Sequence, residues 1–218
     1  MNPRSTLRPF GAALALALVT SLSQAAPVDD AVGELQREWE TIAYKVPAAQ
    51  RAERFEALAA RAHQASVAHP GRAEPLIWEG IVVSSWAGAK GGLGALSLAK
   101  QARGLYETAL KIRPEALEGS ALNSLGVLYY KVPSWPIGFG DKARAQDLLQ
   151  QALAINPKGI DPNYFYGEFL AEGGRSQEAI PYLERALQAA PRAGRELADA
   201  GRRDEVRILL DKVRAQVR

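Results

Sequence analysis

The chain of 218 residues contains no cysteine, one methionine and two histidines. Without cysteine no disulfide can form and no thiol can act as a nucleophile, so packing alone must hold the fold. The histidines, His63 and His69, would point in different directions from one helix. The motifs G-x-S-x-G and H-E-x-x-H are also absent. We therefore expect a protein that is not an enzyme, with no catalytic residues, no metal and no cofactor.

A large excess of charge of one sign is also missing. The formal net charge is +3, and the first 25 residues hold Arg4 and Arg8 but no acid. The remainder then has 25 basic and 24 acidic residues. Nucleic acid is not an expected partner, because binding to phosphates needs a marked basic excess.

The N-terminus has the pattern of an export signal. Arg4 and Arg8 precede the apolar run GAALALALVTSL, and the small-x-small pattern of residues 23–25 follows it. Twelve apolar residues are too few to span a bilayer, and no cysteine follows for lipidation. We predict a signal peptide over residues 1–25, cleaved near Ala25, and a periplasmic protein with no stable membrane anchor. A retained anchor is the alternative.

The rest of the chain is rich in alanine, leucine, glutamate, arginine and glutamine and poor in β-branched residues. This composition favours helix over strand, and 47% apolar residues suffice for a core. We predict an all-α protein.

A repeated pattern ends in proline three times. The segments YETALKIRP, LLQQALAINP and YLERALQAAP close at Pro114, Pro157 and Pro191. Each helix carries three residues at offsets of four and three, which places them on one helical stripe. These triplets are Ala102, Tyr106 and Ala109; Ala145, Leu149 and Ala152; and Ala179, Leu183 and Ala186.

A second pattern, SLGVLYY and YFYGEFL, precedes two of these helices. Gly126 and Gly167 in it predict a close approach of the following helix. Together the two patterns resemble the tetratricopeptide repeat, W-x2-L-G-x2-Y, then A-x3-F-x2-A, then P, and residues 161–191 match it without a gap. The preceding units carry insertions of ten and seven residues between their two helices.

This resemblance implies a right-handed superhelical stack of four to five antiparallel helical hairpins over residues 26–218. The expected hairpins are residues 30–70, 73–114, 116–157 and 161–191, with a capping unit at 193–217.

The resemblance also implies a concave groove that binds a protein or peptide. Helical phase points polar residues of the leading helices into this groove, and the candidates are Asn123, Tyr130, Lys131, Tyr164 and Glu168. An ordinary solvated groove is the alternative.

The two insertions form a second candidate site. The first insert, GAKGGLG at residues 88–94, contains Lys90, and the second, VPSWPIGFGD at 132–141, contains Trp135 and Phe139. The first lacks the order of a phosphate-binding loop and is interpreted as a flexible hinge. We expect the inserts to lie side by side. The aromatic residues then either pack over the core or form the wall of a site. Asp141 is expected to cap the next helix.

Two functions follow. The first is a periplasmic scaffold that binds a protein or peptide partner through the groove and the inserts. The second comes from the segments LYYKVPSWPIGFGDKARA and INPKGIDPNYFYGEFL, which resemble T-component proteins of tripartite ATP-independent periplasmic transporters. That resemblance implies an accessory protein that binds a small molecule, and a homo-oligomer. An enzyme acting through Lys90 and Asp141 is a third alternative.

Overall fold

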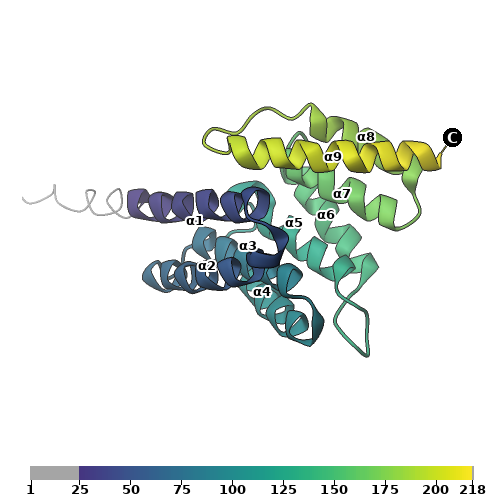
Figure 1. Ribbon diagram of the computed structural model, residues 1–218. Coiled ribbons are helices and arrows are strands. Elements are labelled where there is room, and N and C mark those ends of the chain that lie inside the picture. The colour runs from purple at the N-terminus through teal and green to yellow at the C-terminus, as the bar shows by residue number, and fades with distance from the viewer. Residues whose placement is uncertain (1–24, 218) are drawn as a thin grey trace, which may run out of the picture.

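The computed structural model describes residues 25–217, which form helices and connecting loops (Figure 1). The predicted signal peptide lies almost wholly outside the described residues. Within them no strand is present apart from an isolated bridge between Ser134 and Gly140, so the all-α prediction is confirmed. The helices are α1 (Ala25–Lys45), α2 (Ala48–Ala68), α3 (Ala73–Lys90), α4 (Gly92–Ile112), α5 (Ala116–Lys131), α6 (Lys142–Ile155), α7 (Ile160–Glu172), α8 (Ser176–Leu187) and α9 (Glu196–Gln216).

Consecutive helices pack as neighbouring hairpins. The pairs α1 with α2, α3 with α4, α5 with α6 and α7 with α8 are each in contact, and α9 packs on α8 (Figure 1). The leading helices also contact one another, α1 with α3, α3 with α5 and α5 with α7. They therefore form an inner layer. No helix within residues 25–217 combines the length and the apolarity needed to cross a bilayer.

Glycines on the leading helices let the second helix of each hairpin come close. A Cβ on Gly126 would lie 2.8 Å from Leu149 Cγ, and a Cβ on Gly167 would lie 2.8 Å from Leu183 Cδ2. Both leucines are completely buried. The second helix of each of these two hairpins therefore lies close to the glycine of the first helix, as the repeated sequence pattern predicted.

The first insert is not the flexible hinge that we predicted. Helix α3 continues to Lys90 and α4 begins at Gly92, so only Gly91 separates the two helices. Gly91 and Gly92 have φ angles of 62° and 63°, a left-handed conformation that glycine adopts without strain. Because the flanking alanines and leucines favour helix, the inserted residues lengthen α3 and α4 instead of forming a loop.

The second insert is a hydrogen-bonded loop over residues 132–141. The amide of Gly140 donates to the Pro133 carbonyl at 2.9 Å, and the amide of Asp141 donates to the Tyr129 carbonyl at 2.8 Å. Asp141 is the N-cap of α6, where its Oδ1 accepts from the Arg144 amide at 3.0 Å. Capping by Asp141 was predicted from the sequence and is confirmed.

The first turn of α5 has an unusual backbone. Leu117, Glu118 and Gly119 all have positive φ angles, of 48°, 56° and 78°. Left-handed conformations cost a non-glycine residue about 1–2 kcal/mol each. The Glu118 carboxylate accepts a hydrogen bond of 2.7 Å from Asn156 Nδ2, which ties this turn to the end of α6.

Candidate functional site: a cavity on the inner helices

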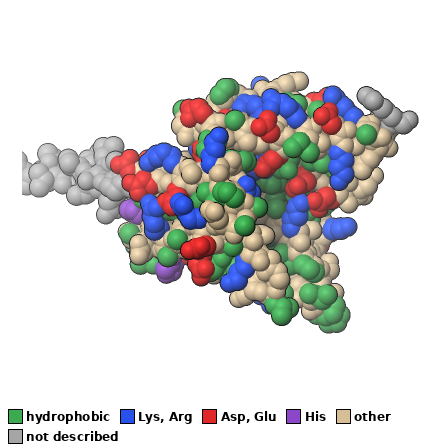
Figure 2. All heavy atoms as spheres, in the orientation of Figure 1, with side chains coloured by type: hydrophobic (Ala, Val, Ile, Leu, Met, Phe, Trp, Pro, Cys, Tyr) green, Lys and Arg blue, Asp and Glu red, His purple; other side chains and the backbone are tan. Residues whose placement is uncertain are grey.

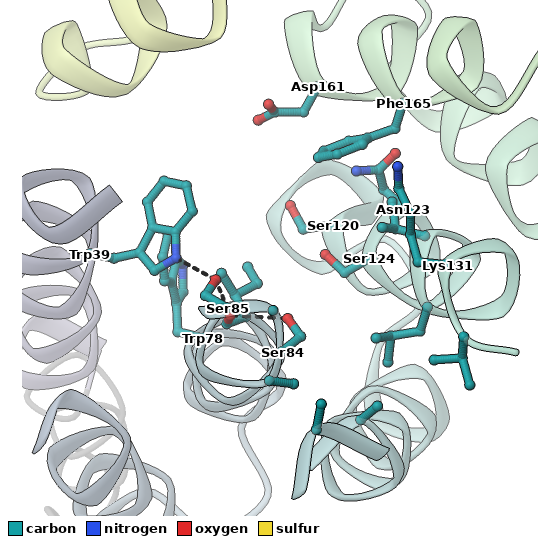
Figure 3. A pocket seen from close by; sticks show the side chains of 18 of the residues that line it. Trp39, Trp78, Ser84, Ser85, Ser120, Asn123, Ser124, Lys131, Asp161 and Phe165 are labelled. Atoms are coloured by element: carbon teal, nitrogen blue, oxygen red, sulfur yellow. Dashed lines mark hydrogen bonds between the residues drawn. The ribbon is translucent and has the colours of Figure 1, made fainter. Parts of the chain in front are cut away.

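A cavity of about 650 Å³ lies against the inner layer of leading helices (Figure 3). It runs along α3 from Trp78 to Gly88 and along α5 from Ser120 to Lys131. Ten or eleven helical residues correspond to about 15 Å. Further walls come from α1, α4, the first turns of α7, α9 and the segment that precedes α9.

The two ends of the cavity differ in chemistry. At the N-terminal ends of α3 and α5 the lining is polar and includes Asp161, Arg192 and Arg195. At the C-terminal ends, next to the inserts, the lining is mostly apolar and includes Leu96 and Ile137, with Lys131 beside them. The cavity is therefore amphipathic along its length.

A second cavity, of about 1020 Å³, adjoins the polar end. It has six lining residues in common with the first cavity, and these form the boundary between the two. They are Trp78, Ser120, Asn123, Asp161, Arg192 and Arg195.

Two buried polar side chains at this boundary lack hydrogen-bond partners. Trp78 and Asn123 are only 4% and 6% exposed, and neither Trp78 Nε1 nor Asn123 Oδ1 makes a hydrogen bond. Figure 3 shows the Asn123 amide projecting from α5 beside Phe165. Leaving a buried donor or acceptor unpaired costs about 1–3 kcal/mol. A ligand with one acceptor and one donor would remove this cost.

Asp161 connects α7 to the C-terminal part of the chain. Its Oδ2 accepts from Arg192 Nη1 at 2.7 Å and its Oδ1 accepts from Arg202 Nε at 2.9 Å. Burial by itself would raise the pKa of this carboxyl, but the two guanidinium groups outweigh burial and hold the pKa at about 2. Asp161 is therefore ionised at neutral pH.

Contacts between the two ends of the chain enclose the polar end of the cavity. Arg195 donates to the Glu40 carboxylate of α1, and its guanidinium lies 5.2 Å from the centre of the Trp78 ring. Gly201 of α9 packs directly against the Tyr44 ring of α1, where a side chain would collide. Helix α9 thus covers the space that the inner helices would otherwise leave open, in agreement with the contact between α1 and α9 (Figure 1).

The five groove residues predicted from the sequence divide into two sets. Asn123 and Lys131 line the cavity. Tyr130 and Tyr164 instead donate hydrogen bonds to Glu168, and Lys131 Nζ lies 3.3 Å from Glu168 Oε1. Burial, reinforced by the Glu168 charge, raises the pKa of the Tyr130 hydroxyl well above its usual value. Tyr130, Tyr164 and Glu168 therefore form a cluster beside the cavity and do not line it.

The predicted residues of the inserts also lie outside the cavity lining. Lys90 is exposed, with its Nζ 5.1 Å from the centre of the Trp86 ring. Phe139 packs edge-on against Tyr129, with ring centres 5.6 Å apart. Trp135 is 87% exposed, so it takes neither of the two positions considered for it, over the core or in the wall of a site.

The inserts themselves lie side by side, as predicted. Gly92 and Leu93 of the first insert and Pro133 and Ile137 of the second line the same cavity. Ile137, which the sequence placed with Trp135 and Phe139 either over the core or in the wall of a site, is a large apolar side chain that the second insert contributes to the lining.

Several residues that line the cavity were not predicted, because their contacts are with residues far away in the sequence. Trp39 of α1 donates from Nε1 to Ser85 Oγ of α3 at 2.8 Å (Figure 3). Arg195 meets Glu40 across 155 positions of sequence. Trp78 is the one lining residue of this group that the sequence could have indicated. It lies two residues before Gly80, a glycine that packs on the next helix, and such glycines mark the inner helices.

The chain is similar to known proteins in sequence and in structure. The sequence profile of the tetratricopeptide repeat matches residues 137–200. A thermophilic TPR protein of Thermus thermophilus superimposes with a TM-score of 0.55 at 16% identity, over 86% of this chain and 94% of that one. MamA gives a TM-score of 0.44 at 21% identity, over 75% of this chain and 90% of that one. No curated protein sequence matches the chain.

Proposed function

We propose that this tetratricopeptide-repeat protein is an exported periplasmic scaffold that binds an extended segment of a partner protein in the cavity on its inner helices. The repeat fold is typical of proteins that bind other proteins, and the sequence of residues 1–25 supports export.

The observation that carries the proposal is the pair of unpartnered groups at the boundary of the two cavities. A peptide group offers one carbonyl and one amide, which match the Trp78 Nε1 donor and the Asn123 Oδ1 acceptor. An extended chain advances about 3.3 Å per residue, so a cavity of about 15 Å accommodates four to five residues. Apolar side chains of the segment would lie near Leu96 and Ile137.

The test removes the Trp78 Nε1 donor and the Asn123 Oδ1 acceptor while keeping an aromatic ring at residue 78 and a side chain of similar size at residue 123. The variants are Trp78→Phe and Asn123→Leu, and the control is Trp86→Phe, because Trp86 does not line the cavity. Each protein is used as bait in a periplasmic extract, and the captured proteins are identified by mass spectrometry. We expect partner recovery to fall about tenfold in each cavity variant, as for the loss of about 1.4 kcal/mol, and to be unchanged in the control.

Unfolding measurements separate loss of binding from loss of fold. Asn123→Leu replaces a side chain whose buried Oδ1 has no hydrogen-bond partner with an apolar side chain of similar size, so its stability should equal or exceed that of the wild type. A stable Asn123→Leu protein that captures the partner as well as the wild type does would contradict the proposal.

The size of the cavity and its cover at one end favour a second candidate function. A volume of about 650 Å³, covered at one end by α9, is in the size range of small-molecule sites. The chain would then be an accessory protein of a solute uptake system, as the likeness to T-component proteins implies. Mass spectrometry of small molecules released from the purified protein tests this candidate. A ligand that the Trp78→Phe variant loses, together with unchanged protein capture, would favour it over the scaffold.

A further inference from the structure

The two inserts together form one exposed edge of the molecule, here called the insert edge (residues 88–94 and 132–141). Three large apolar side chains on it face solvent. Leu93 is fully exposed, Trp135 is 87% exposed and Ile137 is 70% exposed. In Figure 2 hydrophobic side chains cover the projecting tip of the loop between α5 and α6. Most large apolar residues elsewhere in the described chain are buried or half-buried, so this concentration needs an explanation.

The loop that carries two of these side chains is held firmly at its base. Besides the two backbone hydrogen bonds at Gly140 and Asp141, the Ile137 amide donates to the Ser134 carbonyl at 3.2 Å. Phe139 packs against Tyr129, and the Arg103 guanidinium lies 4.7 Å from the Phe139 ring centre. Phe139 thus anchors the loop while Trp135 points away from the body. The tip is presented outward by the fold.

Basic residues lie in and directly next to the insert edge. Residues 88–94 and 132–144 contain three bases, Lys90, Lys142 and Arg144, and one acid, and the next acid along α6 is Asp147. The single acid, Asp141, is occupied as the cap of α6. All three bases are exposed, and none of the described carboxylates forms a salt bridge with them. Residues 132–140, at the tip, carry no charge.

We propose that the insert edge makes reversible contact with the surface of an anionic lipid bilayer. Tryptophan is favoured at the boundary between lipid headgroups and acyl chains, and Trp135, Ile137 and Leu93 would enter this zone. Lys90, Lys142 and Arg144 would then face the lipid phosphates, since basic residues next to an apolar tip bind anionic membranes. This contact overlaps the apolar end of the cavity, because Leu93 and Ile137 line the cavity, whereas Trp135 does not.

The other occupant to consider is a second copy of the chain. A stable protein interface buries about 20–30 residues on each side. The insert edge offers three exposed apolar side chains from two short segments, and its basic residues would repel those of an identical partner. Area and charge both favour the anionic bilayer.

Sedimentation with lipid vesicles tests the proposal. The wild-type chain is mixed with vesicles of phosphatidylcholine alone, and with vesicles of phosphatidylcholine and phosphatidylglycerol in equal parts. The apolar variant is Trp135→Ser with Ile137→Ser, and its control is Val67→Ser with Ile208→Ser, two exposed apolar residues outside the insert edge. The charge variant is Lys142→Glu with Arg144→Glu, and its control is Lys111→Glu with Lys158→Glu. All variants have the same N-terminus, so any contribution from residues 1–24 cancels in the comparison.

We expect the wild type to sediment with the anionic vesicles more than with the neutral ones. Each insert-edge variant should bind the anionic vesicles about tenfold more weakly, and both controls should bind like the wild type. Equal binding by the wild type and the Trp135→Ser, Ile137→Ser variant would overturn the proposal. So would a concentration-dependent dimer, seen by light scattering, that this variant abolishes, because the insert edge would then be a contact between copies.

Discussion

Replacing Asp161 by asparagine tests how the C-terminal part of the chain is held against α7. The substitution preserves size and removes the charge that bridges Arg192 and Arg202. The folded-state pKa is about 2 and the reference value is 3.8, so the carboxylate contributes about 2 kcal/mol of stability at neutral pH. Because the side chain is 30% exposed, solvent screening lowers this to about 1–2 kcal/mol.

The sign of the pH dependence follows from the depressed pKa. A carboxyl with a lower pKa in the folded state stabilises the fold above its unfolded value, and that contribution disappears as the pH falls from 3.8 towards 2. We expect Asp161→Asn to lower the free energy of unfolding by about 1–2 kcal/mol near pH 7. The difference from the wild type should shrink by about half near pH 3.

Urea unfolding, followed by circular dichroism at several pH values, measures both quantities. The control is Asp204→Asn, since Asp204 pairs with Arg207 on the exposed side of α9 at 2.6 Å. Exposed pairs contribute little, so the control should change stability by less than about 0.5 kcal/mol. A difference for Asp161→Asn that is no larger than that of the control, or that stays constant down to low pH, would refute the reasoning.

Two further predictions concern the backbone. Gly167→Ala should destabilise the protein by about 1–2 kcal/mol in urea unfolding, because a Cβ there would lie 2.8 Å from Leu183 Cδ2. Gly104 is a helical glycine with open space around it, so Gly104→Ala should stabilise the protein by up to about 1 kcal/mol. Equal effects at the two sites would exclude the close packing. Glu118→Gly and Glu118→Ala both lose the hydrogen bond from Asn156 Nδ2, but only glycine tolerates the φ of 56°. The glycine variant should therefore be about 1 kcal/mol more stable than the alanine variant, and equal stability of the two would mean that the left-handed turn does not persist in solution.

Much of the fold could be predicted because the repeat encodes its packing locally. The offsets that place Ala145, Leu149 and Ala152 on one stripe follow from helix geometry alone, and all three are buried. Gly126 was interpreted correctly because it recurs as Gly167 at the same place in the repeated pattern, and both glycines contact the following helix closely. Capping of α6 by Asp141 is likewise a contact between residues three apart.

Local patterns were insufficient at the first insert and at Trp135. Four glycines in seven residues suggested a hinge, yet helix propagation from the flanking segments left only Gly91 outside a helix. The sequence offered two positions for Trp135, both of them buried in part. The exposure of Trp135 depends on how Phe139 and the backbone hydrogen bonds orient the loop. This orientation cannot be predicted from the spacing of residues in the sequence.

The sequence by itself predicts an array of helical hairpins. The apolar stripes and the glycines Gly126 and Gly167 recur at regular spacing, and each of them involves residues of a single hairpin. Only the tertiary structure decides that the array forms a cavity with α9 across its polar end. The position of α9 depends on the contacts of Arg195 with Glu40 and of Gly201 with Tyr44, which join α1 to the C-terminal part of the chain. Their positions follow from small rotations accumulated over every intervening hairpin, so no local pattern specifies them.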